Sequence, residues 1–276
     1  MLKLLSPAKL NLFLHITGRR PDGYHNLQTL FQLLDFGDDM TFSPNSNGQL
    51  QLRTQFDEVT SDDNLVIKAA NLLRRHTGCN LGADITLEKR IPTGAGLGGG
   101  SSNAATTLLA LNHLWETNVS IETLAELGAS LGADVPVFVH GHTAWAEGVG
   151  EKLSPVDMPK QHFVVCYPNV HIETAKIFQN KELTRDEDAI TLAAFLERGA
   201  SNSFEKVVRK TYKEVDKALN FMALYAPSKL TGSGSSVFCQ FDSEEKAKDV
   251  LDKIANIGFC FYATGVNQSP VHYQLS

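Results

Sequence analysis

The chain has 276 residues and a mass of 30.2 kDa, which is enough for one or two domains with a sizeable buried core. Its composition, 42% hydrophobic and 20% charged, excludes collagen-like, low-complexity and broadly disordered proteins. The formal net charge of −6 argues against non-specific binding to nucleic acid through a basic surface, so we expect no nucleic-acid partner.

The sequence indicates a cytoplasmic protein without a membrane partner. No apolar run reaches the ~18 to 20 residues of a membrane span, and residues 1–7 lack the apolar length and cleavage site of a signal peptide. The four cysteines are widely scattered, which is typical of reduced thiols rather than of a disulfide framework. His140 and His142 have the spacing of metal ligands, but no third ligand lies nearby in the sequence, so we do not expect a zinc site.

The first half of the chain begins with a strictly alternating strand over residues 9–17. One face of this strand holds Leu10, Leu12, Leu14 and Ile16, and the other holds Lys9, Asn11, Phe13 and His15. A turn over residues 18–23 leads to predicted strands at 27–34 and 49–53. A helix is expected next, capped by Asp62-Asp63-Asn64, running to about Arg75 and ended by Gly78.

Further along, a strand at 83–89 is followed by a glycine-rich segment and a helix over about 103–115. Ser120 caps another predicted helix with Leu124, Leu127 and Leu131 on one face, and residues 132–136 break it. A strand at 143–146 and a linker at 153–159 complete this half, which places a domain boundary between residues 155 and 156.

In residues 156–276 we expect strands at 163–167, 237–241 and 259–263, with helices near Leu192 and over 204–225 and 243–257. Because strands and helices are mixed without strict βαβ alternation, the predicted fold class is α+β. The two predicted domains are 1–155 and 156–276.

The glycine-rich segment is the clearest functional signal. A strand, a run of glycines, two serines and a helix together make an anion-binding device, because glycines let the backbone approach a phosphate and the helix N-terminus presents unpaired N–H groups. The alternative is an ordinary glycine-rich turn, but a simple connection does not require so many flexible residues. The segment reads Pro92, Thr93, Gly94, Ala95, Gly96, Leu97, Gly98, Gly99, Gly100, Ser101 and Ser102.

Other phosphate-binding motifs fit this segment poorly. Residues 94–99 satisfy G-x-G-x-x-G, but Glu116, the acidic residue at about the required spacing, ends a predicted helix rather than a second strand. No lysine follows the glycines as a Walker motif requires, and no D-F-G or H-R-D sequence marks a protein kinase. A nucleotide phosphate loop of another kind remains.

The segment resembles the central motif of the GHMP kinases, a family of small-molecule kinases. Four further stretches support the resemblance in the family's order: residues 7–12, 18–25, 131–136 and 230–234. The Asp22-Gly23-Tyr24-His25 stretch is similar to the branch of the family that acts on 4-diphosphocytidyl-2-C-methyl-D-erythritol, in isoprenoid precursor biosynthesis.

The resemblance implies a two-lobed fold with an N-terminal ATP-binding lobe and a C-terminal ferredoxin-like lobe. It implies transfer of the γ-phosphoryl group of ATP to the 2-hydroxyl of that cytidyl substrate, giving ADP and the 2-phosphate. ATP and Mg²⁺ are the implied cofactors, with Ser102 as a candidate Mg²⁺ contact. The alternatives are another GHMP kinase, of homoserine or mevalonate type, and a non-catalytic binding protein on the same scaffold.

The resemblance also assigns the reacting residues. Asp134 is the implied general base, although an aspartate before Val-Pro can equally cap a helix. Lys9, which without the resemblance is a solvated strand lysine, is implied to pair with Asp134 and stabilise the substrate oxygen. Asn11 shares the face of Lys9 and is expected to orient the same hydroxyl.

The remaining assignments concern the two ligands. By resemblance Tyr24 stacks on the cytosine ring, His25 binds its edge, and Phe178 forms the opposite stacking face with Thr174 nearby. Lys89 either neutralises nucleotide phosphate or covers the strand edge. Gly232 and Ser233 lie in a second glycine-rich loop, which is expected near the substrate phosphates or is a simple hairpin turn. We expect a monomer or a weak homodimer.

Overall fold

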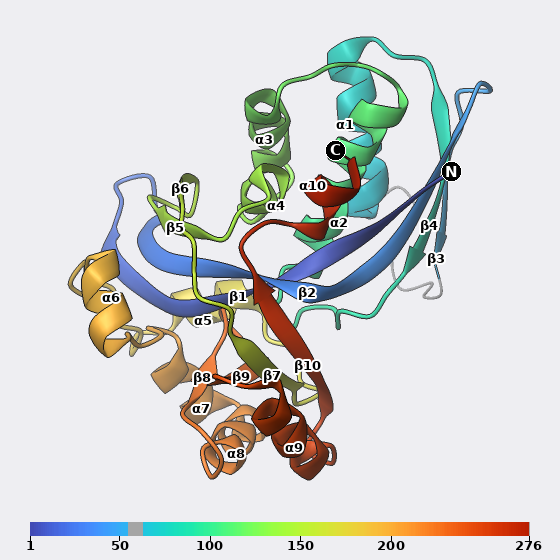
Figure 1. Ribbon diagram of the computed structural model, residues 1–276. Helices are drawn as coiled ribbons and strands as arrows, with labels where there is room; N and C mark the ends of the chain where they lie inside the picture. Colours follow the sequence, from blue (N-terminus) through green and yellow to red (C-terminus); the bar gives the residue numbers. More distant parts are fainter. Residues whose placement is uncertain (55–62, 276) are drawn as a thin grey trace.

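The computed structural model describes residues 1–54 and 63–275. Two long antiparallel strands, β1 (Leu2–Arg19) and β2 (His25–Asn45), run through the middle of the molecule (Figure 1). On one side of β2 lie β4 (Gly82–Glu88) and then β3 (Leu50–Thr54). On the other lies β10 (Phe259–Val266), which pairs with β2 through its last two residues and with β7 (His162–Tyr167) through the residues before them. The sheet ends with β9 (Val237–Phe241) and β8 (Ser228–Leu230).

Helices cover the two ends of this sheet in separate groups (Figure 1). The group above the long strands comprises α1 (Leu65–Thr77), α2 (Gly99–Leu114), α3 (Ile121–Ala129), α4 (Val135–His140) and α10 (Pro270–Leu275). The group below comprises α7 (Glu205–Thr211), α8 (Lys213–Met222) and α9 (Glu244–Ile254). The remaining elements are β5 (Ala144–Glu147), β6 (Lys152–Pro155), α5 (Thr174–Gln179) and α6 (Leu192–Arg198). No helix of the described residues is long and apolar enough to cross a membrane.

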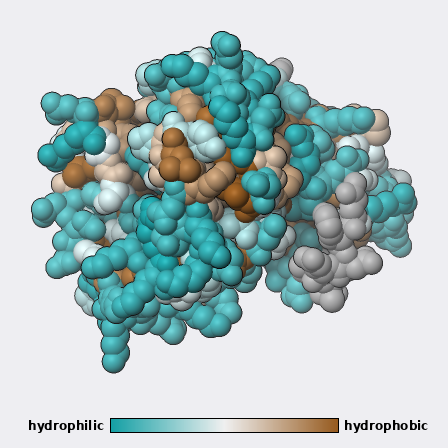
Figure 2. Space-filling model, turned by 90° about the horizontal axis from the view of Figure 1, so that it is seen from below, coloured by the Kyte–Doolittle hydropathy of each residue, from teal (hydrophilic) through white to brown (hydrophobic). Residues whose placement is uncertain are grey.

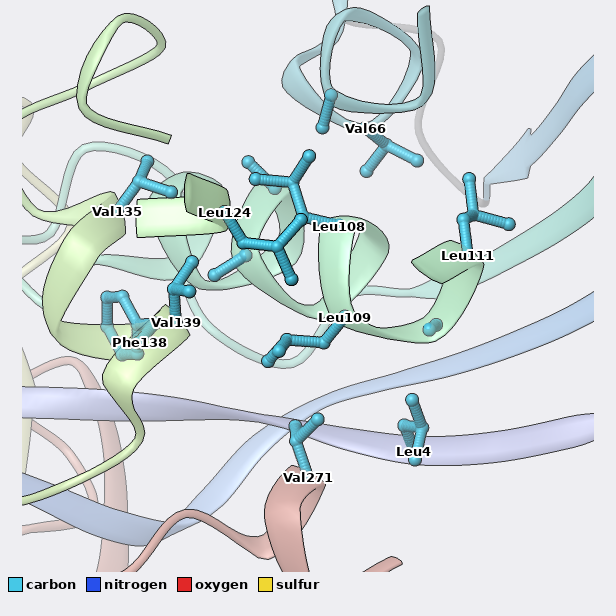
Figure 3. Close-up of a cluster of buried hydrophobic side chains, with 14 of the residues drawn as sticks. Leu4, Val66, Leu108, Leu109, Leu111, Leu124, Val135, Phe138, Val139 and Val271 are labelled. Carbon is cyan, nitrogen blue, oxygen red and sulfur yellow. The ribbon is translucent and has the colours of Figure 1, made fainter. Parts of the chain in front are cut away.

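The upper core is built around α2, which is buried along most of its length. Figure 3 shows Leu108, Leu109 and Leu111 of this helix among side chains of α1, α3, α4 and β1. Val271 of α10 joins the same cluster, so the last helix of the chain packs on the lobe formed by the first half. A second core cluster lies between the lower strands and α7, α8 and α9. The face in Figure 2 is mostly hydrophilic with separate hydrophobic patches, which is ordinary for a folded protein.

Most predicted elements are present, with their caps. Asn64 caps α1 through its side chain, and α1 ends at Gly78 in the left-handed conformation, as predicted. Of the other two cap candidates, Asp62 lies outside the described residues. Ser120 caps α3 as predicted, but α3 ends at Ala129, so Leu131 is not part of its apolar face.

The strict alternation predicted for β1 is wrong beyond Asn11. Asn11 pairs with Phe31 and Leu14 with Thr29, so β1 has one residue more than β2 over this interval. Such a bulge moves the following side chains to the other face. Phe13 therefore packs in a central cluster with Leu10 and Leu12, whereas Leu14 contacts the lower core.

Several boundaries also differ. Helix α2 begins at Gly99, four residues before the predicted start. The sequence did not predict these residues as helical because they are glycines and serines, which are poor helix formers. The helix expected over 204–225 is divided into α7 and α8 by Tyr212, whose backbone is extended (φ −116°, ψ 98°). The predicted linker contains β6, which pairs with β5. The short elements α4, α5, α10 and β8 had no counterpart among the predicted elements.

Candidate active site

Two adjoining cavities bring the predicted site residues together. The first has a volume of about 460 Å³ and the second about 400 Å³, and we call them the acceptor cavity and the nucleotide cavity after the ligands that the resemblance implies. Gly94, Gly96 and Gly98 line both, so the glycine segment is the wall between them. Predicted residues lining the acceptor cavity are Lys9, Asn11, Asp134, Thr174, Phe178, Gly232 and Ser233. Those lining the nucleotide cavity are Lys89, Pro92, Thr93, Gly94, Ala95, Gly96, Leu97, Gly98, Gly99, Gly100 and Ser101.

The glycine segment has a backbone that requires glycine. Gly94, Gly96 and Gly98 have φ of +67°, +77° and +73°, in the left-handed region that side chains disfavour. A Cβ atom on Gly96 would lie 2.6 Å from the carbonyl oxygen of Thr231, so the loop over residues 231–236 fits closely against the segment. This wall could not be built with larger residues.

Helix α2 begins at the end of the segment and supplies the anion-binding groups. Gly98 occupies its N-cap position and has no side chain to cap the first N–H groups. Residues 98–101 line the nucleotide cavity, so these free N–H groups and the positive end of the helix dipole lie at its wall. The cavity therefore suits a polyphosphate.

Of the two serines at this helix start, only Ser101 lines the nucleotide cavity. The hydroxyl of Ser102 is fully buried and lies 2.8 Å from the Ser6 hydroxyl, so it does not face the cavity. No group of three or more His, Cys, Asp or Glu side chains in the described parts of the chain could hold a metal ion. Ser102, the candidate Mg²⁺ contact, therefore does not line the cavity that suits a polyphosphate.

Lys89 is held by a buried carboxylate that the sequence analysis missed. Asp38, on β2, is fully buried and forms an ion pair with Lys89. The carboxylate also accepts hydrogen bonds from the backbone N–H groups of Arg90 (2.7 Å) and Ile91 (2.8 Å) and from the side chain of Asn103 (2.9 Å). Asp38 therefore fixes both ends of the glycine segment, and the charge of Lys89 is largely balanced within the protein.

Lys9, Asn11 and Asp134 form one hydrogen-bonded cluster in the acceptor cavity. The Lys9 ammonium donates to Asn11 Oδ1 at 2.6 Å and lies 3.2 Å from Asp134 Oδ2. The Lys9 side chain is only 4% exposed, whereas that of Asp134 is 35% exposed. The buried lysine thus holds a carboxylate that a ligand in the cavity can still reach.

The position of Asp134 bears on whether it caps a helix or faces the acceptor cavity, the two interpretations that the sequence left open. It stands at the N-cap of α4, but its side chain makes no capping hydrogen bond. The carboxylate points to Lys9 instead, across from β1. A plain capping role is therefore not what this side chain performs.

The loop over residues 231–236 is both a hairpin turn and part of the site. It joins β8 to β9, which pair at Leu230 and Val237. Thr231 Oγ1 accepts a hydrogen bond from the Asn11 N–H at 2.9 Å, and Ser236 N–H donates to the carbonyl of Ala95 at 3.1 Å. The loop thereby connects the glycine segment to β1.

Phe178 lines the acceptor cavity, and the ring of His25, which does not line it, stacks on Phe178 with centroids 5.0 Å apart. His25 Nε2 is buried and has no hydrogen-bond partner among the described residues. Burial, and then the positive charges of Arg185 and Arg19, lower the pKa of His25 below its ordinary value. Tyr24 is 65% exposed and does not line the cavity, so the structure does not bring it to Phe178.

With this geometry established, comparisons with known proteins identify the family. Residues 64–142 match the family model for the GHMP kinases N terminal domain, and residues 180–258 that for the GHMP kinases C terminal region. The chain belongs to the GHMP kinase family. It is accordingly a small-molecule kinase that uses ATP, and the two-lobed α+β fold predicted from the sequence is confirmed.

Individual relatives refine the comparison. The chain is 51% identical over 269 residues to a 4-diphosphocytidyl-2-C-methyl-D-erythritol kinase from Mannheimia succiniciproducens, covering 98% of this chain and 89% of that protein. A solved 4-(cytidine 5'-diphospho)-2C-methyl-D-erythritol kinase is 33% identical, with a TM-score of 0.83 over 96% of this chain and 99% of that one. A homoserine kinase from Cytophaga hutchinsonii shares the fold at 16% identity, with a TM-score of 0.71 over 98% of this chain and 96% of that one.

Several residues of this GHMP kinase site gave no signal in the sequence. In addition to Asp38, which lines neither cavity, these are Thr29, Phe31, His171 and Glu173, which line the acceptor cavity. Thr29 accepts a hydrogen bond from Asn11 Nδ2 at 2.9 Å, and the Phe31 ring lies 5.2 Å from the Lys9 ammonium. Thr29 and Phe31 lie on β2 opposite the irregular part of β1, so only the pairing register could have revealed them.

Proposed function

We propose that the chain transfers the γ-phosphoryl group of ATP to the 2-hydroxyl of 4-diphosphocytidyl-2-C-methyl-D-erythritol, giving ADP and the 2-phosphate, in isoprenoid precursor biosynthesis. The observation that carries this proposal is the arrangement of two cavities on opposite sides of one glycine segment. A phosphoryl donor on one side and an alcohol on the other can meet at that wall. The 51% identity to a kinase of this name supports the choice of substrate.

In the reaction we assign the acceptor hydroxyl to Asp134. Its carboxylate is the exposed member of the cluster and takes the hydroxyl proton as the oxygen bonds to phosphorus. Lys9 stabilises negative charge on that oxygen, because its ammonium has three N–H donors, of which Asn11 and Asp134 engage two. Asn11 holds Lys9 in place, being anchored itself by Thr29 and Thr231.

The cytidine end of the substrate is assigned to His25 and Phe178. The unpartnered Nε2 of His25 is a buried polar atom that a cytosine edge can satisfy. Phe178 supplies an aromatic face, and stacking on a base contributes about 1–3 kcal/mol. Tyr24 remains the proposed second face, which requires its exposed ring to turn towards the cavity and the ring of His25 to move off Phe178.

The nucleotide phosphates are assigned to residues 92–101 and the start of α2. We propose that Mg²⁺ enters with the triphosphate, whose oxygens and water supply its ligands, because this ion often keeps several waters. Bound there, it would neutralise charge on the phosphates. We also propose that Thr174, Gly232 and Ser233, which line the acceptor cavity, contact the substrate. The hydroxyls of Thr174 and Ser233 lie 2.6 Å apart.

The proposal is tested by measuring ADP release from ATP and Mg²⁺ with four alcohols in parallel: the cytidyl substrate, free methylerythritol, mevalonate and homoserine. We expect turnover with the cytidyl substrate alone. Turnover with mevalonate or homoserine instead would replace the proposed substrate by that of another GHMP kinase. ATP binding without turnover of any of the four would favour a binding protein.

Compartment and assembly are also proposals. We propose a cytoplasmic protein, in line with four cysteines that form no disulfide. We further propose a monomer or a weak homodimer, which sedimentation at several protein concentrations would test.

A further inference from the structure

His171 lies where the two cavities meet, and no step described above uses it. Its imidazole packs directly on the first glycine of the phosphate segment, since a Cβ atom on Gly94 would overlap its Nδ1. Gly94 lines both cavities, and His171 lines the acceptor cavity. Its side chain makes no hydrogen bond to the residues that the structure describes. The exposed ring thus packs on Gly94 with its Nδ1–Cε1 edge, which leaves Nε2 as the nitrogen that can bind a ligand.

The charges around the acceptor cavity show what this ring could bind. Among its described lining residues, only Lys9 and His171 have side chains that can carry a positive charge. Lys9 is buried and already bonded to Asn11 and Asp134. The acidic lining residues are Asp134 and Glu173, and Glu173 pairs with Lys176 at 2.6 Å. Glu173 also interacts electrostatically with His171, but the two form no ion pair, so a diphosphate entering this cavity would meet one cationic group without a hydrogen-bonded partner among the described residues.

We infer that His171 is a phosphate-binding residue, whose imidazolium donates a hydrogen bond to a phosphate oxygen at the junction of the two cavities. This inference rests on the proposed function for the identity of the phosphates. Histidine gains its proton in the physiological pH range, and a bound phosphate favours the protonated form. The phosphate belongs either to the diphosphate of the cytidyl substrate or to the triphosphate of ATP.

Equilibrium binding separates these sources without requiring turnover. The probes are CDP-glycerol, whose diphosphate is esterified at both ends, a non-hydrolysable ATP analogue, and cytidine as the ligand without phosphate. Each is titrated by calorimetry at pH 6.0 and pH 8.0 into the wild type, His171→Ala, His171→Lys and the control His113→Ala. His113 is exposed in the last turn of α2, outside both cavities.

For one phosphate ligand we expect His171→Ala to weaken binding about tenfold at pH 6.0 and less at pH 8.0, the size of one charge-assisted hydrogen bond. His171→Lys should bind that ligand equally well at both pH values, and cytidine binding should not change. If His171→Ala weakens binding of CDP-glycerol, His171 binds the diphosphate of the acceptor substrate. If it weakens binding of the ATP analogue, His171 binds the triphosphate of the donor.

Two results would overturn the inference: unchanged binding of both phosphate ligands, or an equal loss of cytidine binding, which would mean that the ring only shapes the cavity. Measuring the turnover of the wild type as well distinguishes failure of the proposed function from failure of the phosphate-binding role of His171. If no alcohol is phosphorylated but the binding difference persists, the proposed function is wrong and the phosphate site stands.

Discussion

At the scale of single residues, Asp38 holds the glycine segment in place although it belongs to no motif of the sequence. Its carboxylate accepts hydrogen bonds from two backbone N–H groups and one side-chain amide and forms an ion pair with one ammonium. All four groups lie on the two flanks of the glycine segment. Its side chain is fully buried, and that of its partner Lys89 is 16% exposed. Breaking a buried pair by removing one partner is costly, because the other charge stays buried without compensation.

We therefore expect Asp38→Asn to lower the free energy of unfolding by about 3–5 kcal/mol, as for other broken buried pairs. The neighbouring Asp39→Asn is a matched control, because the Asp39 side chain is 53% exposed and lies 3.4 Å from Arg90. Such an exposed pair contributes below about 1 kcal/mol. Urea unfolding of the two variants measures the difference. Equal, small losses would show that Asp38 does not hold the glycine segment.

The lowered pKa of His25 gives a pH dependence with a definite sign. The unfolded chain binds the proton near pH 6.5 and the folded chain at a lower pH, so folding disfavours the protonated form. The contribution of His25 to stability is therefore complete above about pH 6.5 and is lost as the pH falls below that value. The neutral ring is also the form that can both donate to and accept from a cytosine edge.

The measurement is an NMR titration of the His25 Cε1 resonance, assigned by its absence from His25→Asn. We expect a midpoint below about 6.5, and a smaller loss of stability on acidification in His25→Asn than in the wild type. A midpoint at or above that value would mean that burial and the positive charges of Arg185 and Arg19 do not lower the pKa of His25.

At the scale of elements, the site depends on how two glycine-rich loops fit together. Gly96 combines a φ of +77° with close contact to the carbonyl oxygen of Thr231. A side chain there is strained by about 1–2 kcal/mol, and displacing the facing loop adds about 1–3 kcal/mol.

Gly96→Ala should therefore lower the free energy of unfolding by about 2–5 kcal/mol and weaken binding of an ATP analogue, measured by denaturation and calorimetry. Gly100→Ala is the control for stability. Gly100 lies within α2, and its nearest neighbour for a new Cβ is Leu65 at 3.4 Å. That variant should be as stable as the wild type or gain up to about 1 kcal/mol. Similar losses for both variants would contradict the role given to the left-handed conformation.

The elements also show where sequence reasoning succeeds. Caps and periodicity predicted α1 and α3, because Asn64 and Ser120 act within a few residues of their own position. The face reversal after Asn11 could not be predicted, since a bulge depends on the partner strand. The start of α2 was missed for a related reason: its glycines are there to pack closely rather than to favour a helix.

At the scale of the whole molecule, both lobes contribute to one site. Lys9 and Asn11 come from β1, Asp134 from the start of α4, and Ser233 and Thr174 from the second half of the chain. Strand β10 joins the two parts of the sheet, and α10 returns to the upper core. We propose the domain boundary between residues 155 and 156, directly after β6, with α10 as an addition to the first lobe.

The residues of the candidate site that lie in local sequence motifs were predicted, and those outside such motifs were not. The glycine segment, Lys9, Asn11 and Asp134 were found because family motifs contain them, and the structure places them around adjoining cavities. Asp38, Thr29 and His171 were not, because their roles arise from strand pairing and from the approach of distant loops. A buried aspartate in a strand gives no sign in the sequence of which backbone it will bind.

The most direct test of the proposed catalytic cluster is the turnover of Asp134→Asn with the cytidyl substrate, ATP and Mg²⁺. Asparagine keeps the shape of the side chain but cannot take the hydroxyl proton. We expect kcat to fall by about 10²–10⁴-fold, with the melting temperature and the dissociation constants of both substrates nearly unchanged. A variant that turns over at the wild-type rate would show that Asp134 does not act on the acceptor hydroxyl.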